Sequence, residues 1–430
     1  MMGKLLVLGA GTAGTMVANK LRQQLTDDWT ITIVDQDDTH HYQPGYLMLP
    51  FGTYTPKQIV RRRSRFIGDG IDLRFGTADR IDTERSVVEM RGGETLPYDQ
   101  LVIATGAGIH PEETPGMMEE EWQRSVFDFY SLEGATALRD KLKTFTGGRL
   151  VVHITEMPIK CPVAPLEFAF LADDHFTERG IRDAVDITYV TPLDGAFTKP
   201  VASTHLGGML SDRNINLETD FMVERIDNDA KALVSYDERE IPFDLLVTVP
   251  LHMGAEFVGR SGLGDELRFV KVDKHTLQAV GHDNIFALGD ASNIPASKAG
   301  SVAHFAAEIF TENFLDHIAG RPMAKSFDGH ANCFVESGAG KGLLIDFNYD
   351  TQPLPGTYPL AGVGPLALLK ESRLNHIGKL AFRWIYWHML LPGRRLPVPA
   401  LMSMRGKLPA PEIPQTTGET FAQPQKERTP

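Results

Sequence analysis

The chain has 430 residues, of which 43 are Lys or Arg, 56 are Asp or Glu and two are Cys. This length exceeds one ordinary hydrophobic core and predicts two or three domains. A formal net charge of −13 argues against general nucleic-acid binding, and two cysteines are too few for a disulfide scaffold or a zinc ribbon. A catalytic or redox pair of cysteines remains compatible with this composition.

The N-terminal sequence MMGKLLVLGAGTAG predicts a first strand followed by a glycine turn. That glycine turn stands where a signal peptide would need a longer apolar stretch and a small-residue cleavage site. The longest apolar stretch, residues 380–391, is interrupted by Arg383 and His388, and no uncharged run approaches the roughly 18–20 residues that span a bilayer. We therefore expect neither a signal peptide nor a transmembrane helix, and any membrane contact should be made from the surface.

Residues 3–35 predict a strand, a glycine turn, a helix and a second strand. The turn holds Gly9, Gly11 and Gly14 in a GxGxxG pattern, and Asp35 ends the second strand. In dinucleotide-binding units these glycines allow a tight turn, close phosphate approach and helix–strand packing, and the acid binds a ribose hydroxyl. A merely glycine-rich turn is the alternative. The fingerprint alone does not distinguish FAD from NAD.

Two later segments favour FAD. Strand 101–105 leads into Ala104-Thr105-Gly106, and strand 284–288 leads into Leu288-Gly289-Asp290. These segments resemble the ATG and GD signatures of flavoproteins with two dinucleotide-binding domains. The resemblance implies that Asp290 contacts the ribityl chain and that a helix over 300–314 faces the flavin ring. The predicted FAD-binding residues are Gly9, Gly11, Gly14, Asp35, Ala78, Thr105, Gly106, Gly289, Asp290 and Lys298.

A second fingerprint is missing. Strand 149–155 opens another βα-like unit, with 185–190 as its partner strand, but the residues that follow, 156–167, contain no glycine and three prolines. Strand 185–190 is followed by Thr191 and Pro192, not by the acid that would hold an NAD ribose. This pattern predicts that the nicotinamide site is lost and that Cys161 stands in its place. The alternative is a divergent NAD site with an incidental buried cysteine.

The two cysteine segments narrow the family. Cys161-Pro-Val-Ala-Pro165-Leu-Glu167 and a second cysteine, Cys333, before a glycine-rich hairpin resemble the sulfide:quinone oxidoreductase family up to about Lys407. The resemblance implies an α/β fold of two tandem Rossmann-like (three-layer ββα) domains plus a C-terminal amphipathic membrane-binding segment. It divides the chain into 1–112 with 281–330 as a discontinuous FAD-binding domain, 113–280 as a second Rossmann-like domain with a degenerate NAD site, 331–407 as a hairpin and membrane/quinone segment, and 408–430 as an irregular tail.

The resemblance also implies roles for the cysteines. A Cys161–Cys333 disulfide, or a sulfur-bridged version of it, would accept HS⁻ and leave a persulfide on one cysteine and a thiolate on the other. Which cysteine carries the sulfur stays open. Glu167 is either the acid–base group or an ordinary helix-start glutamate, and Lys298 either stabilises reduced flavin or is a surface lysine. Many family members have a third cysteine near residues 125–129; its absence here predicts non-covalent FAD.

The C-terminal part changes in character. After a predicted hairpin from about residue 331 and a Gly/Pro-rich loop over 353–365, residues 370–407 hold eight basic residues and one acid among aromatic and aliphatic side chains. This composition predicts an amphipathic segment lying in the lipid interface; a helical pair packed on the flavin domains is the alternative. The family resemblance implies a quinone site here, formed by Phe347, Lys379 and Phe382.

Together these features predict a peripheral, monotopic enzyme of the inner or cytoplasmic membrane that oxidises sulfide to polysulfide sulfur and reduces a membrane quinone. Its partners would be sulfide, quinone and the bilayer surface, with a homo-oligomer as a further possibility and no metal or nucleic acid. Three other functions are compatible: a type II NADH:quinone dehydrogenase, the flavin subunit of a cytochrome-linked sulfide dehydrogenase, and a non-catalytic flavoprotein.

Overall fold

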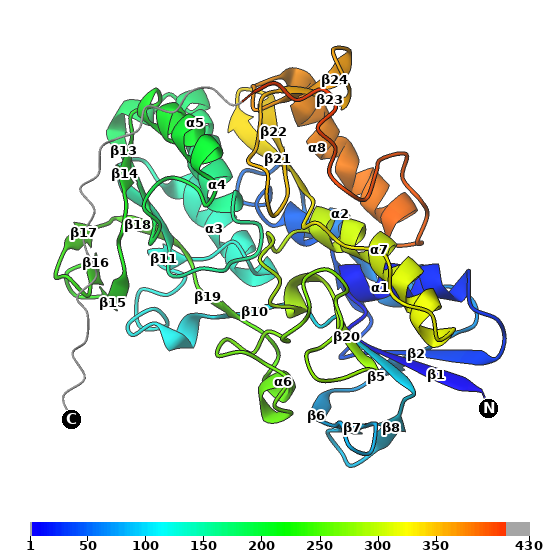
Figure 1. Ribbon diagram of the computed structural model, residues 1–430. Coiled ribbons are helices and arrows are strands. Elements are labelled where there is room, and N and C mark those ends of the chain that lie inside the picture. The colour runs from blue at the N-terminus through cyan, green and yellow to red at the C-terminus, as the bar shows by residue number, and fades with distance from the viewer. Residues whose placement is uncertain (1, 410–430) are drawn as a thin grey trace, which may run out of the picture.

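The structure is a computed structural model that describes residues 2–409 (Figure 1). Its first unit is built on a five-stranded parallel sheet in the order β20-β9-β1-β2-β5. The strands are β1 (Gly3–Leu8), β2 (Trp29–Asp35), β5 (Ile71–Phe75), β9 (Gln100–Ile103) and β20 (Ile285–Ala287). Parallel strands covered on both faces read as nearly continuous apolar runs, which is why β1 and β9 could be predicted from sequence.

Successive residues of β1 point to opposite faces of this sheet. Leu5 and Val7 join the core beneath helices α1 (Thr12–Arg22) and α7 (Gly300–Ile318), whereas Leu6 and Leu8 pack on a small antiparallel sheet on the other face. That sheet consists of β6 (Ala78–Asp82), β7 (Val87–Met90) and β8 (Thr95–Pro97). The first unit therefore has three layers, visible at the right and bottom of Figure 1.

The second unit repeats this arrangement around a five-stranded parallel sheet in the order β11-β18-β12-β13-β14. Helices α3, α4 and α5 accompany it on the left of Figure 1, and β15, β16 and β17 form a small antiparallel sheet beside it. The bounds are β11 (Val126–Phe127), α3 (Leu132–Thr144), β12 (Gly148–Ile154), α4 (Ala164–Glu178), β13 (Val185–Val190), α5 (Pro200–Ser211), β14 (Ile215–Glu218), β15 (Val223–Asp227), β16 (Ala232–Ser235), β17 (Glu240–Pro242) and β18 (Leu245–Val249).

Short elements complete these two units. Strand β10 (Gly108–His110) pairs with β19 (Leu251–Met253), and β3 (Thr39–His41) pairs with β4 (Val60–Arg62). Helices α2 (Pro56–Ile59) and α6 (Glu256–Arg260) are single turns. The β10–β19 pair joins the chain leaving the first unit to the chain returning from the second.

The C-terminal part contains a four-stranded sheet in the order β21-β22-β24-β23. The predicted hairpin is formed by β21 (Ala331–Gly338) and β22 (Lys341–Phe347), while β23 (Gly356–Leu360) and β24 (Gly364–Leu368) follow it. Helix α8 (Arg373–Ile385) packs on β21, β22 and β24 and continues into a π-helical turn over Tyr386–Leu390. Among residues 2–409 no helix is both long enough and apolar enough to cross a membrane.

The prediction of a loop throughout residues 353–365 was wrong in part, because Gly356–Leu360 forms β23. Prolines disfavour interior strands since they cannot donate a ladder hydrogen bond. Within this sheet β23 pairs with β24 and lies at the edge, where Pro359 stands opposite Pro365, and Gly356 also forms an isolated bridge with Lys407. The predicted tail over 408–430 lies outside the described residues except for its first two positions.

Candidate active site

The glycine turn after β1 has the conformation that its sequence predicts. Gly9 has a φ of +92°, and a Cβ there would lie 2.5 Å from the carbonyl oxygen of Ala104. A Cβ on Gly14 would lie 1.8 Å from the carbonyl oxygen of Gly9, so glycine is needed for α1 to approach β1 this closely. A Cβ on Gly11 would meet nothing within 4 Å, so the space in front of the α1 N-terminus is open.

Asp35 lies at the end of β2 and faces the same open space. Its Oδ2 accepts a hydrogen bond from the Ala10 N–H at 2.7 Å and an ion pair from Arg63 at 2.7 Å. The buried Arg63 guanidinium also donates to the carbonyl oxygens of Asp37, Thr39 and Ala10, so it fixes the loop after β2. Sequence reasoning missed Arg63, because the run Arg61–Arg63 reads as surface charge until β3 and β4 pair.

One cavity of about 340 Å³ brings most of the predicted residues together. It reaches from the glycine turn, past the ATG and GD segments, to the cysteine loop and α8. Of the predicted residues it is lined by Gly9, Gly11, Asp35, Thr105, Gly106, Gly289, Asp290, Lys298, Cys161, Glu167, Lys379 and Phe382.

The cavity fits a flavin dinucleotide. Cβ atoms added at Gly11, Gly106 and Gly300 would all meet open space, as expected where a ligand approaches the backbone. The buried Oγ1 of Thr105 has no hydrogen-bond partner among residues 2–409, so it is a polar group left for a ligand. Burial raises the pKa of Asp290, because the charged carboxylate is disfavoured away from water. A ribityl hydroxyl would donate a hydrogen bond to this carboxylate and stabilise it.

Two lysines, the buried Lys298 and the partly exposed Lys160, lie near Asp290. Lys298 donates from Nζ to the carbonyl oxygens of Asp290 at 3.0 Å and Ser292 at 2.9 Å, and it lies 3.6 Å from the centroid of the Phe269 ring. Burial lowers the pKa of Lys298 to about 8 and also lowers the pKa of Lys160, which sequence reasoning missed. The surface-lysine alternative for Lys298 is therefore wrong, since its side chain is only 7 % exposed.

Cys161 is held at the start of α4 by its backbone. Its N–H donates to the carbonyl oxygen of Lys298 at 2.7 Å, and its own carbonyl accepts from the Ala164 N–H at 2.8 Å. Its φ is +47°, a left-handed conformation that costs free energy for a side-chain-bearing residue and is concentrated at functional sites. The first of these bonds ties the loop over residues 156–163 to the segment that precedes α7.

Cys333 lies on β21 and, like Cys161, is a free thiol. Burial raises the pKa of both thiols, to about 12 for Cys333, and the negative charge of Glu167 is the next cause for each. The two are near enough that Cys333 further raises the pKa of Cys161. Cys333 is not among the residues that line the cavity. The resting thiols are thus held protonated, so a base is needed to activate them.

Glu167 is the predicted acid–base group. It is fully buried in the first turn of α4, where its Oε1 accepts an ion pair from Lys379 of α8 and a hydrogen bond from the Glu336 N–H at 2.6 Å. Burial raises the pKa of Glu167 to about 7, and Lys379 offsets only part of that effect. Because it can exchange a proton near neutral pH between the cysteines and α8, the ordinary helix-start alternative is disfavoured.

Three predicted residues lie away from the cavity besides Cys333. Gly14 acts inside the α1–β1 contact, and Ala78 starts β6 in the small sheet. Phe347 is buried on β22 and lines a neighbouring cavity, with its ring centroid 5.6 Å from the Nζ of Lys199. The structure therefore does not bring Phe347 together with Phe382 in one cavity.

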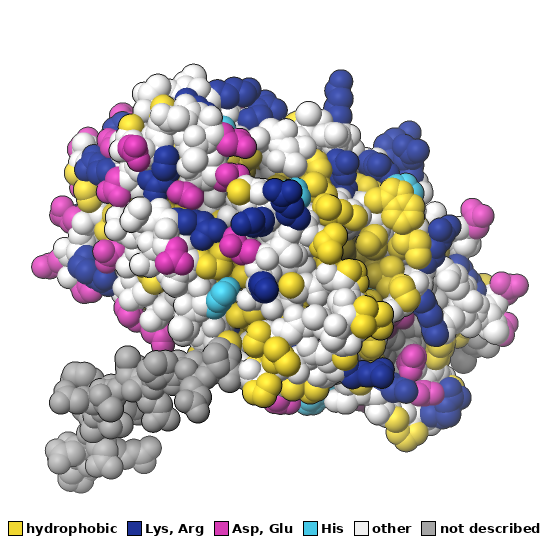
Figure 2. All heavy atoms as spheres, turned by 90° about the horizontal axis from the view of Figure 1, so that it is seen from above, with side chains coloured by type: hydrophobic (Ala, Val, Ile, Leu, Met, Phe, Trp, Pro, Cys, Tyr) yellow, Lys and Arg dark blue, Asp and Glu magenta, His cyan; other side chains and the backbone are white. Residues whose placement is uncertain are grey.

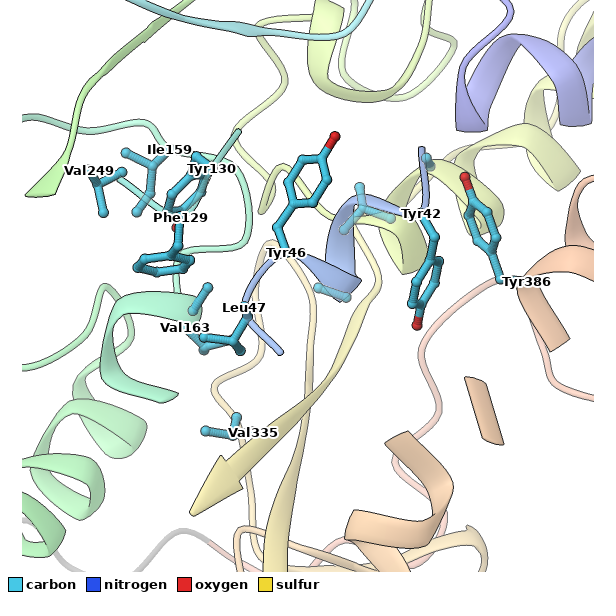
Figure 3. Close-up of a cluster of buried hydrophobic side chains, with 14 of the residues drawn as sticks. Tyr42, Tyr46, Leu47, Phe129, Tyr130, Ile159, Val163, Val249, Val335 and Tyr386 are labelled. Carbon is cyan, nitrogen blue, oxygen red and sulfur yellow. The ribbon is translucent and has the colours of Figure 1, made fainter. Parts of the chain in front are cut away.

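A contact that sequence reasoning missed joins the C-terminal segment to the glycine turn. The Tyr386 hydroxyl is hydrogen-bonded to Thr12 Oγ1 and to His40 Nε2, both at 2.7 Å. In Figure 3, Tyr386 lies beside Tyr42, and Tyr46 lies between this pair and Phe129 and Tyr130 of the second unit. Burial and Arg63 lower the pKa of His40 to about 3, so His40 acts as a neutral hydrogen-bonding group.

Comparison with known proteins agrees with this geometry. Residues 3–307 match the family model described as pyridine nucleotide-disulphide oxidoreductase, and the chain belongs to that family. The predicted α/β fold of the FAD-dependent oxidoreductase type is thereby confirmed.

Within this family, the predicted resemblance to sulfide:quinone oxidoreductases is also confirmed. The mitochondrial sulfide:quinone oxidoreductase of Dictyostelium discoideum is 27 % identical over 397 residues, covering 91 % of this chain and 86 % of the relative. The mouse enzyme of the same name is 24 % identical over 397 residues with the same coverage. The solved sulfide:quinone oxidoreductase of Aquifex aeolicus shares the fold with a TM-score of 0.75 and 21 % identity, covering 91 % of this chain and 92 % of that one.

Proposed function

We propose that the protein is a sulfide:quinone oxidoreductase that uses non-covalent FAD. The observation that carries the proposal is Cys161 in the same cavity as the glycine turn, with Glu167, Lys379 and a second free cysteine around it. Relatives named sulfide:quinone oxidoreductase that align over nine-tenths of the chain support it. Because the chain has two cysteines and the sulfur chemistry uses both, neither is left for a covalent bond to flavin.

Sulfide oxidation needs an electrophilic sulfur and a route for two electrons. When Cys161 and Cys333 form a disulfide, HS⁻ attacks one sulfur and yields a persulfide on that cysteine and a thiolate on the other. Return to the disulfide releases sulfane sulfur, one proton and two electrons. FAD, when bound, would supply the two-electron redox chemistry, and Gly9, Gly11, Asp35 and Asp290 would hold it. Glu167 accepts the released proton.

We place the quinone and membrane contacts on α8. Lys379 and Phe382 line the cavity from this helix, and the other face of the helix exposes Leu374, Ile377 and Trp384. Figure 2 shows hydrophobic side chains gathered over the region where α8, β23 and β24 lie in Figure 1, bordered by lysine and arginine side chains. An apolar face with a basic border is typical of a protein that lies in the lipid interface.

We also propose the domain division suggested by the sequence. Residues 1–112 and 281–330 would bind FAD, 113–280 would form a second Rossmann-like domain without a nicotinamide site, and 331–407 would form the quinone and membrane segment. The two three-layer units and the separate four-stranded sheet support this division.

An anaerobic titration of the FAD-loaded protein tests the function. We expect one equivalent of sulfide to bleach the flavin absorbance and a short-chain ubiquinone analogue to restore it. NADH should not bleach the flavin at a comparable rate. Residues 156–162, where an NADH phosphate would approach, contain no glycine but two prolines and Cys161. Bleaching by NADH and not by sulfide would favour a type II NADH:quinone dehydrogenase. The structure of NDH2 from Plasmodium falciparum in complex with NADH shares the fold of this chain with a TM-score of 0.62.

A further inference from the structure

A row of charged side chains leads from the cavity to the surface of α8. Glu167 is fully buried and paired with Lys379, and the Glu336 side chain on β21 is 2 % exposed. The Oε2 of Glu336 lies 2.8 Å from the Nδ1 of His376, whose side chain is 27 % exposed. His376 is the most exposed member of this row, since the Lys379 side chain is 14 % exposed.

The two carboxylates in this row are incompletely paired. Glu167 Oε2 and Glu336 Oε1 are both buried and have no hydrogen-bond partner among residues 2–409. A buried carboxylate oxygen without a donor costs free energy, so a network that only held α8 in place would be expected to satisfy both. The Glu336 N–H donates to Glu167 Oε1 at 2.6 Å, and Glu167 is paired with Lys379. Burial lowers the pKa of Lys379, but the charges of Glu167 and Glu336 outweigh that effect and raise it, so Lys379 lies close to both carboxylates.

The proposed reaction requires a proton from solvent. Oxidation of HS⁻ to sulfane sulfur releases one proton and two electrons, whereas reduction of a quinone to a quinol consumes two of each. One proton per turnover must therefore enter the site. Glu167 is buried and lines the cavity, which flavin and quinone would fill in the proposed reaction, so a proton from solvent would reach it through a neighbouring group.

We infer that His376 and Glu336 form the route by which this proton enters, delivering it to the Glu167–Lys379 pair. His376 takes a proton from solvent and transfers it across 2.8 Å to Glu336, which passes it to the pair beside the quinone site. Neither residue contacts the cysteines in this scheme; both act through Glu167. The inference rests on the proposed function and adds to it the direction from which the proton arrives.

Separate half-reactions in the FAD-loaded full chain test this inference. We expect His376→Asn and Glu336→Gln to leave flavin reduction by sulfide unchanged and to slow flavin reoxidation by decylubiquinone about tenfold or more, which is at the low end of general acid–base effects. Added imidazole should restore the rate of His376→Asn, and a structural role would not show that rescue. Glu371→Gln is the matched control, since Glu371 pairs with Arg213 at 2.9 Å close to the start of α8.

Infrared spectroscopy gives a readout that needs no turnover. After a proton is released by a laser flash, the carbonyl band of protonated Glu167, identified by its loss in Glu167→Gln, should rise more slowly in His376→Asn. The pKa of Glu167, about 7, makes this band titrate near neutral pH.

The outcomes separate this inference from the function on which it rests. Wild-type protein that is not reduced by sulfide, or not reoxidised by decylubiquinone, contradicts the proposed function. An active wild type with unchanged quinone rates and band kinetics in His376→Asn overturns the proton route alone. Equal slowing of both half-reactions without imidazole rescue also overturns it. If Glu336→Gln does not fold, His376→Asn decides, because its side chain is partly exposed.

Discussion

At the scale of single residues, the site depends on two thiols that are hard to ionise. Burial and the nearby Glu167 charge raise the pKa of Cys161 and Cys333, which suits the proposed disulfide pair, in which a thiolate forms only when sulfide attacks. The left-handed backbone of Cys161 directs its side chain into the cavity at some cost in stability.

Serine at either cysteine should therefore abolish the sulfide reaction. We expect Cys161→Ser and Cys333→Ser each to retain FAD and to lose sulfide-dependent flavin bleaching by at least about a thousandfold, since a hydroxyl cannot form a persulfide. Stopped-flow absorbance measures the rate, and dithionite, which needs no cysteine, should bleach both variants as fast as wild type. Bleaching by sulfide in either variant would contradict a two-cysteine reaction.

The protonation of Glu167 should set the pH dependence of quinone reduction. Its pKa of about 7 means that the protonated form, which can donate to a quinone, is lost as pH rises through about 7. The rate of flavin reoxidation by decylubiquinone should fall over that range, and Glu167→Gln should lack the inflection.

The direction of a second shift checks this assignment. Lys379 lowers the pKa of Glu167, so Lys379→Met should move the inflection to higher pH. An inflection that stays in place in both variants would assign the titration to another group.

At the scale of elements, α8 joins the cavity to a surface of exposed apolar side chains. Lys379 and Phe382 point into the cavity, whereas Ile377 and Trp384, 56 % and 59 % exposed, point away from it. Double substitution of Ile377 and Trp384 by Gln should weaken binding to phospholipid vesicles about a hundredfold or more, because burial of two large apolar side chains is worth about 3 kcal/mol or more. Sedimentation with vesicles measures this.

The matched control lies on the second unit. Tyr236, after β16, is 72 % exposed and distant from α8 in Figure 1, so Tyr236→Gln should bind vesicles like wild type. Flavin bleaching by sulfide should be unchanged in all these variants. Equal loss of binding in the α8 variant and in Tyr236→Gln would argue against α8 as the contact surface.

A second C-terminal contact should matter for stability. Lys407 forms an ion pair with Asp346 on β22, and both side chains are 1 % exposed. Removal of one partner of a buried ion pair leaves an uncompensated charge. Lys407→Met should therefore lower the free energy of unfolding by about 3 kcal/mol. Asp346 would keep its other contact, with His330 at 2.8 Å. Urea denaturation measures the change. Lys143→Met, which breaks an exposed pair with Asp140, should leave the free energy of unfolding nearly unchanged.

Sequence patterns predicted the elements that are determined by residues close together in the chain. Strands β1, β9, β12 and β13 are buried apolar runs, and the glycine turn requires a conformation that glycine favours. The contacts that complete the site are not local. Tyr386 meets Thr12 across 374 positions, and Lys379 meets Glu167 across 212, so neither pairing leaves a periodic pattern in the sequence. Phe347 lines a neighbouring cavity and not the one that Phe382 lines, so its contact with quinone stays a prediction.

At the scale of the whole molecule, the charge is unevenly distributed. The net charge is −13, yet residues 370–407 hold eight basic residues and one acid. Two of these eight basic residues, Lys379 and Lys407, add little to the surface charge, because they pair with buried carboxylates. Arg61 and Arg65, outside this segment, add to the basic surface. Burial, followed by the charges of Arg65 and Arg383, lowers the pKa of Arg61, and the Arg61 guanidinium lies 4.7 Å from the ring centroid of Trp387.

This distribution predicts how vesicle binding responds to salt. The acidic remainder of the chain is repelled by anionic lipid, while the arginines near α8 are attracted at short range; salt at about 0.5 M screens both, with a Debye length of roughly 4 Å. Because the arginines are nearest the lipid, their attraction dominates at low salt. We therefore expect binding to anionic vesicles to weaken as the salt concentration rises, and binding to neutral vesicles to stay unchanged. Vesicles with roughly 30 % anionic lipid have a strong surface potential and serve for the measurement.

Substitution identifies the arginines responsible for that response. Arg61→Gln with Arg65→Gln should reduce the salt dependence, since each basic residue near an anionic surface contributes about 1 kcal/mol. Arg80→Gln is the control, because Arg80 is exposed on β6, at the opposite end of the molecule from α8 in Figure 1. If Arg80→Gln reduced the salt dependence as much as the double variant, the net charge of the molecule would govern membrane attachment, and the local arrangement of arginines would not.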